Sequence, residues 1–65
     1  MVEYLTEQEL TVLRMLPTMM SNAEIADAMD RSVNTVKSHL KSLYRKLGVE
    51  RRRDAVERAR ELELL

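Results

Sequence analysis

The sequence predicts an all-α protein, a bundle of four short helices that forms one domain over residues 1–65. Apolar residues recur at helical spacing in four stretches, and no stretch shows the alternation typical of a strand. Residues that cap helices well stand directly before three of these stretches. A chain of 65 residues buries only a small core, so we expect its stability to be marginal.

The first two predicted helices each begin with a capping box. In this motif a hydroxyl residue is followed three positions later by Glu, and each side chain can bond the other residue's amide. The two boxes are Thr6 with Glu9 and Ser21 with Glu24. The first helix is expected over about residues 7–16, where Pro17 stops it because proline lacks an amide donor. The second is expected over about residues 22–29.

The third predicted helix is the longest, over about residues 33–47, with Ser32 as its N-cap and Gly48 as a left-handed C-cap. Its apolar residues fall on one face: Val33, Val36, Leu40, Leu43, Tyr44 and Leu47. The fourth helix is expected over about residues 51–64, and its apolar stripe is Ala55, Val56, Ala59 and Leu62.

A net charge of zero conceals a strong separation of charge along the chain. Residues 1–30 carry one basic and six acidic side chains, whereas residues 31–53 carry eight basic and one acidic. Residues 54–65 are acidic again, with four acids and two bases. A basic segment between acidic ones is typical of proteins that bind polyanions, although small helical proteins also segregate charge by chance.

The predicted second and third helices have the proportions of a helix-turn-helix. On the polar side of the third, Asn34, Lys37, Ser38 and Lys41 follow one another at helical spacing as a single stripe. Lys can donate to guanine, Asn can bond adenine at two points, and a major groove admits one such helix. A merely solvated helix face would explain Lys and Ser, but not the absence of Asp and Glu between Arg31 and Gly48.

Other classes of function find no support in the residues. The chain has no cysteine and one histidine, so we expect no disulfide, no metal site and no cofactor. We do not expect an enzyme, because there is no carboxylate pair in an apolar setting, no nucleophile with a base and no Gly-rich phosphate loop. Apolar runs are too short for a membrane helix or a signal peptide, which favours a cytoplasmic protein.

Four motifs in order make residues 5–65 resemble the LuxR/FixJ-type DNA-binding domain, and most of all the MalT-like branch of large regulators. The matching segments are Leu5-Thr6-x-x-Glu9, Ser21-Asn22-Ala23-Glu24-Ile25-Ala26, Val33-Asn34-Thr35-Val36-Lys37-Ser38-His39-Leu40 and Leu43-Tyr44-Arg45-Lys46-Leu47-Gly48-Val49. The resemblance implies a bacterial transcription regulator that binds double-stranded DNA, with its third helix in the major groove. A regulator normally needs a sensor domain, for which 65 residues leave no room, so we expect the chain to be the C-terminal effector domain of a larger regulator. A free-standing small regulator is the alternative.

The resemblance assigns roles to individual residues. Base reading is expected from Asn34, Lys37, Ser38 and Lys41, the stripe already found from periodicity. Phosphate contacts are expected from Asn22, Thr35, Arg45, Lys46, Arg51 and Arg52. The fourth helix is expected to support a weak homodimer, favoured on DNA, through Ala55, Val56, Ala59 and Leu62.

Two departures from the family pattern bear on helix ends. Met19 stands where the family usually has Gly, so a left-handed cap after the first helix is expected to be absent or strained. Glu63 stands where Gly often ends the fourth helix, so that helix is expected to run on as far as Leu65. The alternative function is a helical protein-interaction module that binds RNA polymerase or another regulator, for which exposed Met side chains would be suitable.

Overall fold

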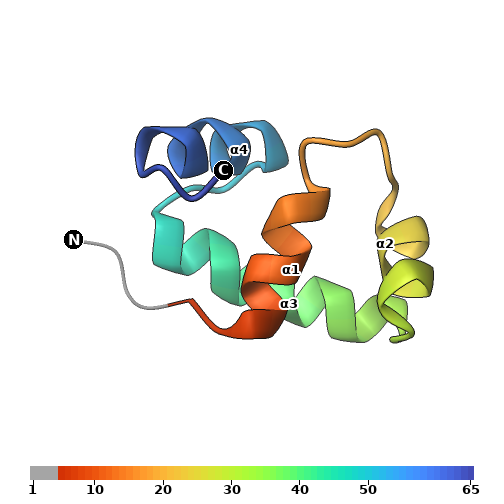
Figure 1. The fold of residues 1–65 in the computed structure, drawn as a ribbon. Helices are drawn as coiled ribbons and strands as arrows, with labels where there is room; N and C mark the ends of the chain where they lie inside the picture. The colour runs from red at the N-terminus through yellow and green to blue at the C-terminus, as the bar shows by residue number, and fades with distance from the viewer. Residues whose placement is uncertain (1–4) are drawn as a thin grey trace.

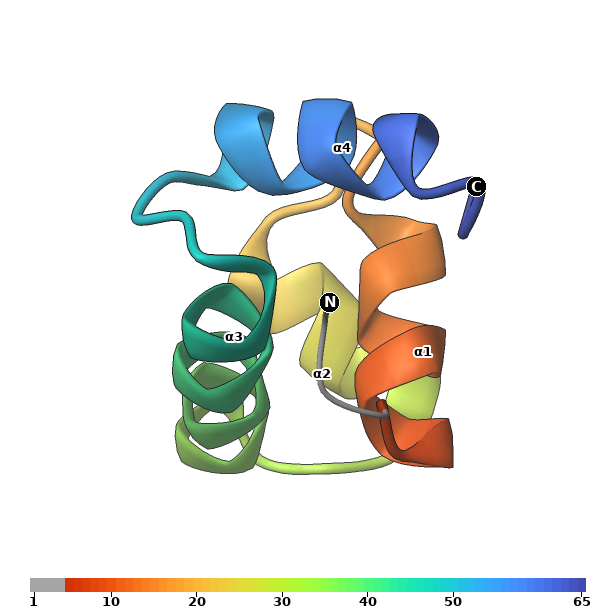
Figure 2. The ribbon, with the colours of Figure 1, turned by 90° about the vertical axis from the view of Figure 1, so that its left-hand side faces the viewer.

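The computed structural model describes residues 5–65, and this part of the chain contains helices and no strand. The four helices are α1 (Glu7–Met15), α2 (Asn22–Met29), α3 (Val33–Leu47) and α4 (Arg52–Glu61). Helix α3 is central, because it packs against α1, α2 and α4 (Figure 1). Helix α4 lies across the ends of α1 and α3 (Figure 2). The predicted all-α bundle is therefore confirmed.

Both predicted capping boxes are present at the starts of α1 and α2. The Thr6 amide donates to Glu9 Oε1 at 2.9 Å, and Thr6 Oγ1 accepts from the Glu9 amide at 3.1 Å. Ser21 and Glu24 repeat this exchange at 2.8 and 3.2 Å. Each box satisfies two amides that a helix N-terminus leaves without a helical partner. These local bonds explain why α2 begins at Asn22 and α1 at Glu7, as expected.

Helices α3 and α2 end with a residue in the left-handed region. Gly48, at φ 73°, follows α3, and the next amide, that of Val49, donates to the Tyr44 carbonyl at 3.0 Å. Asp30 follows α2 at φ 55° and allows the Arg31 amide to reach the Ala26 carbonyl at 2.9 Å. This bonding is that of the Schellman motif, which turns the chain sharply away from the helix axis.

The end predicted for the fourth helix is wrong. Helix α4 stops at Glu61 and does not continue to 64 or to Leu65. Glu63 takes the left-handed conformation, at φ 60°, in which glycine is usual, and the Leu64 amide then donates to the Ala59 carbonyl at 2.8 Å. The physical reason is packing, because the reversal turns Leu64 back against the core, where it is partly buried.

The core is one cluster that draws on every helix. Its fully or nearly fully buried apolar members are Leu5, Val12, Leu13, Leu16, Ile25, Ala26, Val36, Leu40, Leu43, Leu47, Ala55 and Ala59. The two alanines of α4 are completely buried, and their small side chains let this helix approach α1 and α3 closely. The apolar stripes expected from helical periodicity are thus the faces that meet in the interior.

The left-handed Glu63 leads to a stability prediction. We expect Glu63→Gly to raise the free energy of unfolding by up to about 1 kcal/mol, because glycine adopts positive φ without a steric penalty. Thermal melting followed by circular dichroism measures the change. The control is Glu57→Gly at an exposed position inside α4, which should instead lower stability by about 1 kcal/mol. A loss of stability in both variants would contradict the assignment of strain to Glu63.

Candidate functional site

The stripe predicted on the third helix is an exposed surface of α3. Asn34, Lys37, Ser38 and Lys41 are all exposed, and their side chains make no hydrogen bond or ion pair within the described residues. The opposite face of the same helix is fixed in the core through Val36, Leu40, Leu43 and Leu47. The helix therefore presents polar and cationic groups on a rigid support, with all their donors available to a ligand.

The residues expected to contact phosphate fall into two groups. Arg45 and Arg51 are exposed, Asn22 is the half-buried first residue of α2, and Thr35 is half-buried in the first turn of α3. The Thr35 hydroxyl lies 2.9 Å from that of Ser32, which also accepts from the Thr35 amide at 3.1 Å. The other two, Lys46 and Arg52, are both bound inside the protein.

Lys46 is bound to a buried carboxylate. Its Nζ lies 2.8 Å from Glu9 Oε1, and the two side chains are only 13% and 4% exposed. Ser42 Oγ donates to the other oxygen of Glu9, Oε2, at 2.6 Å. With the amide of Thr6, the N-cap of α1, three donors converge on one carboxylate, which thus joins α1 to α3.

These donors determine the ionisation of Glu9. Burial by itself raises the pKa of Glu9, but hydrogen bonds from Lys46, Ser42 and the Thr6 amide, together with the Lys46 charge, outweigh it. The result is a pKa lowered from 4.5 to about 2. The carboxylate is therefore charged throughout the neutral and mildly acidic range, and the Glu9–Lys46 pair persists there.

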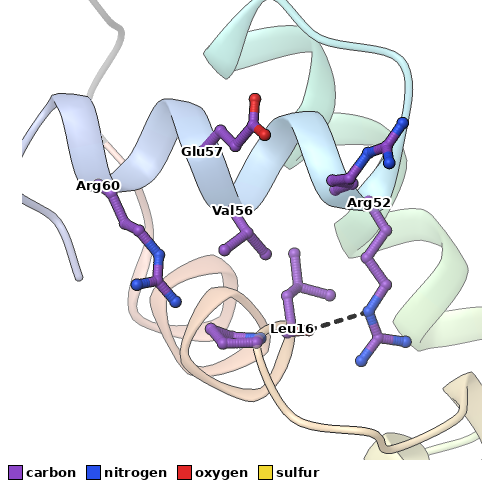
Figure 3. A pocket seen from close by; sticks show the side chains of 7 residues that line it. Leu16, Arg52, Val56, Glu57 and Arg60 are labelled. Atoms are coloured by element: carbon purple, nitrogen blue, oxygen red, sulfur yellow. Dashed lines mark hydrogen bonds between the residues drawn. The ribbon is translucent and has the colours of Figure 1, made fainter.

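Arg52 caps the end of α1 from the first turn of α4. Its Nε donates to the Leu16 carbonyl at 3.0 Å (Figure 3). Its Nη2 donates to the carbonyls of Thr18 at 3.0 Å and Met15 at 3.5 Å. A cation at a helix C-terminus satisfies free carbonyls and complements the helix dipole. Arg52 thus takes over the task of the missing glycine, since Met19 is not in the left-handed region and its side chain is 98% exposed.

An open groove of about 440 Å³ runs between the end of α1 and α4. Leu16 and Val56 face each other across it, with Arg52 and Arg60 at its borders (Figure 3). None of its lining residues belongs to α3. The groove is therefore separate from the exposed stripe of the third helix.

The four residues expected to support a dimer differ in exposure. Ala55 and Ala59 are completely buried in the core, whereas Val56 and Leu62 are partly exposed. Only the latter two offer surface to a second copy. Along the described residues 5–65, no group of three or more metal-ligating side chains is present, and no helix is long and apolar enough to cross a membrane.

The internal roles of Glu9, of its partner Lys46 and of Arg52 are missed in the sequence analysis. Glu9 was interpreted only as a capping residue, yet it is 3% exposed and shares helical spacing with Val12, Leu13 and Leu16. That spacing was the available signal, because a charged residue within an apolar stripe needs a buried partner. For Arg52 no such signal exists, since its carbonyl partners lie more than 30 residues away.

Comparison with known proteins identifies the family. A family model described as "Bacterial regulatory proteins, luxR family" matches residues 3–59. The chain belongs to the luxR family. The HTH-type transcriptional regulators MalT of Klebsiella pneumoniae and Yersinia pestis are 43% and 41% identical to it over 58 residues.

The MalT relatives are much longer proteins. Each MalT match covers 89% of this chain but 6% of the relative. A similar fold occurs in a solved structure, the response regulator ChrA of a heme-sensing two-component system, with a TM-score of 0.92 and 36% identity. That match covers 97% of this chain and 31% of ChrA. The four-helix unit is thus a small part of each of these relatives.

The lowered pKa of Glu9 makes stability depend on pH. Because the folded state favours the carboxylate, its contribution is complete above pH 4.5 and is lost as the pH falls toward 2. The shift corresponds to about 3 kcal/mol. We expect thermal melting temperatures that fall steeply between pH 5 and 2, and a much flatter dependence in Glu9→Gln.

Glu24→Gln is the matched control for the pH dependence of Glu9. Glu24 also occupies a capping box, and bonds from the Ser21 amide and hydroxyl lower its pKa, but its side chain is exposed. Glu24→Gln should flatten the fall in melting temperature between pH 5 and 2 less than Glu9→Gln does. Equal flattening in the two variants would show that the buried Lys46 and Ser42 bonds do not govern the titration.

Proposed function

We propose that this chain is a sequence-specific DNA-binding domain of a bacterial transcription regulator, with α3 in the major groove of double-stranded DNA. The observation that carries the proposal is the exposed stripe of α3, which is cationic, free of acids and backed by a buried apolar face. Membership of the luxR family and the transcription-regulator relatives support the same function. The positive charge of the stripe is complementary to a polyanion, and the major groove of DNA admits one α-helix.

Each residue of the exposed stripe has a distinct chemical capacity at base edges. Lys37 and Lys41 can donate to O6 and N7 of guanine, and the Asn34 amide can donate and accept at one adenine. Ser38 can act as donor or acceptor. All four lie in the first three turns of α3, the part of a recognition helix that reaches the bases in helix-turn-helix docking.

Phosphate contacts would flank this stripe on both sides. Arg45 and Arg51 are exposed cations near the end of α3 and the start of α4, while Asn22 and Thr35 lie at the starts of α2 and α3. Such contacts set the orientation of the helix on DNA and carry no sequence information. For Lys46 and Arg52, which the internal bonds occupy, we propose that the contribution to DNA binding is support of the fold.

On DNA we propose a weak homodimer. Val56 and Leu62 provide the exposed part of the α4 stripe, which is small beside the roughly 800 Å² per partner of a standard interface. Binding to adjacent half-sites about one helical turn apart would bring two copies together. The larger protein around this domain would supply any input signal, since the chain spans 6% of its MalT relatives.

In vitro selection from a random duplex library tests the function directly. The proposal predicts enrichment of one half-site, and the spacing of paired half-sites reports the dimer. Binding should also weaken steeply with salt, as expected when cations displace counterions from phosphates. The alternative, a module that binds RNA polymerase or another regulator, predicts no enriched sequence and no steep salt dependence.

Lys37 and Lys41 provide the test of base reading. We expect Lys37→Ala and Lys41→Ala each to weaken binding to the selected sequence by about 1–3 kcal/mol and to affect random duplex much less. Titration of both DNAs by fluorescence anisotropy measures the difference. The control Arg45→Ala should weaken both complexes alike. Equal losses on both DNAs for the two lysines would mean that they contact only phosphates.

Arg51 combines a poor helix cap with a proposed phosphate contact. It is the N-cap of α4, yet its side chain makes no capping bond and its charge opposes the helix dipole. We expect Arg51→Ser, with Asp54 three residues later, to add about 0.5–2 kcal/mol of stability and several degrees to the melting temperature. Affinity for any duplex and its salt dependence should both decrease.

Paired measurements on Arg51→Ser separate the two roles of Arg51. Thermal melting tests the cap, and DNA titration at two salt concentrations tests the phosphate contact. A lower melting temperature would contradict the capping assignment. Unchanged DNA binding in a more stable variant would contradict the phosphate contact.

A further inference from the structure

The carboxylate of Glu9 lies directly behind the recognition helix. It joins α1 to Ser42 and Lys46 of α3 through bonds of 2.6 and 2.8 Å, and its side chain is 4% exposed. We propose that Ser42 and Lys46 are positioning residues that fix the rotation of α3 about its own axis, and that Lys46 is not a phosphate contact. This inference rests on the proposed function, since it concerns how α3 is held against DNA.

The positioning residues and the DNA-facing stripe lie on the same ridge of α3. Ser38, Ser42 and Lys46 are successive residues at i, i+4 and i+8, so they form one row along the helix surface. Ser38 is exposed, whereas Ser42 and Lys46 are both half-buried and both bind Glu9 of α1. A rotation of α3 that moved Ser38 across the major groove of DNA would therefore pull Ser42 and Lys46 away from Glu9.

Apolar packing alone does not supply this control. The buried face of α3 consists of Val36, Leu40, Leu43 and Leu47, and burial of such side chains is favourable without being directional. Hydrogen bonds to a charged oxygen are directional and stronger than neutral ones. Base recognition needs its side chains held to within about 0.5 Å and 10–20°. The Glu9 bonds provide a constraint of that kind.

The same contacts argue against a phosphate role for Lys46. Its Nζ would have to leave a buried carboxylate that has a full negative charge, and an unpaired buried charge is strongly unfavourable. The negative charge of Glu9 also cancels the positive charge of Lys46 as seen from a DNA phosphate outside the protein. Lys46 therefore adds little to the number of counterions that DNA releases on binding, and the salt dependence should be insensitive to its removal.

The experiment compares three variants with the wild-type chain: Ser42→Ala, Lys46→Met and the double variant Glu9→Gln/Lys46→Met, which leaves no buried charge unpaired. Each is titrated with the selected duplex and with random duplex over a range of salt concentrations. Circular dichroism establishes a temperature at which every variant compared is folded. If Lys46→Met does not fold, the other two variants decide.

For each of the three variants we expect the dissociation constant for random duplex, divided by that for the selected duplex, to fall by about tenfold or more relative to wild type. This change is the equivalent of one good base contact. The slope of log K against log salt on random duplex should stay unchanged. The matched control is Arg45→Met at the residue that precedes Lys46 in α3, proposed as a phosphate contact, which should reduce that slope by about one and leave the ratio unchanged.

Two results would overturn the positioning role. A slope reduced by about one in Lys46→Met, with equal losses on both DNAs, would make Lys46 a phosphate contact. An unchanged ratio and slope in all folded variants would mean that the Glu9 bonds contribute to stability alone. A wild-type chain that selects no sequence would instead refute the proposed function, which keeps the two failures distinguishable.

Discussion

One buried carboxylate constrains how the bundle can be assembled. Glu9 is enclosed by α1 and α3, and a charge in that place is tolerated only with donors on every side. The donors come from the Thr6 amide, from Ser42 and from Lys46, so the start of α1 and the second half of α3 must meet in one register. The position of the exposed stripe on α3 depends on that register.

Polar contacts at helix ends help to stabilise a bundle whose apolar core is small. Hydroxyl side chains cap the starts of α1, α2 and α3, and left-handed residues reverse the chain after α2, after α3 and just beyond α4. The end of α1 has no left-handed residue; the Thr18 hydroxyl there donates to the Met15 carbonyl at 2.6 Å, and the Arg52 guanidinium from α4 donates to the carbonyls of Leu16 and Thr18. Basic residues that seem available for a polyanion in the sequence are thus partly committed to the fold.

Much of the fold could be predicted from local signals. The capping boxes and Gly48 fixed where three helices begin or end, because such bonds join residues that are neighbours along the chain. The exposed stripe of α3 could also be predicted, since exposure of Asn34, Lys37, Ser38 and Lys41 follows from the helical spacing of the apolar face. The end of α4 could not be predicted from local signals, because it depends on Leu64 packing against a core that is formed by distant residues.

Residue spacing and composition are enough to specify the helices, the polar face of the third helix and the separation of charge. Which charged residues stay available to a ligand depends on how the helices pack together. Lys41 and Lys46 look alike in sequence, yet one is exposed and the other is bound to Glu9. The physical reason is that a buried charge selects its partner by distance in space, and contacts between residues 37 positions apart leave no local pattern.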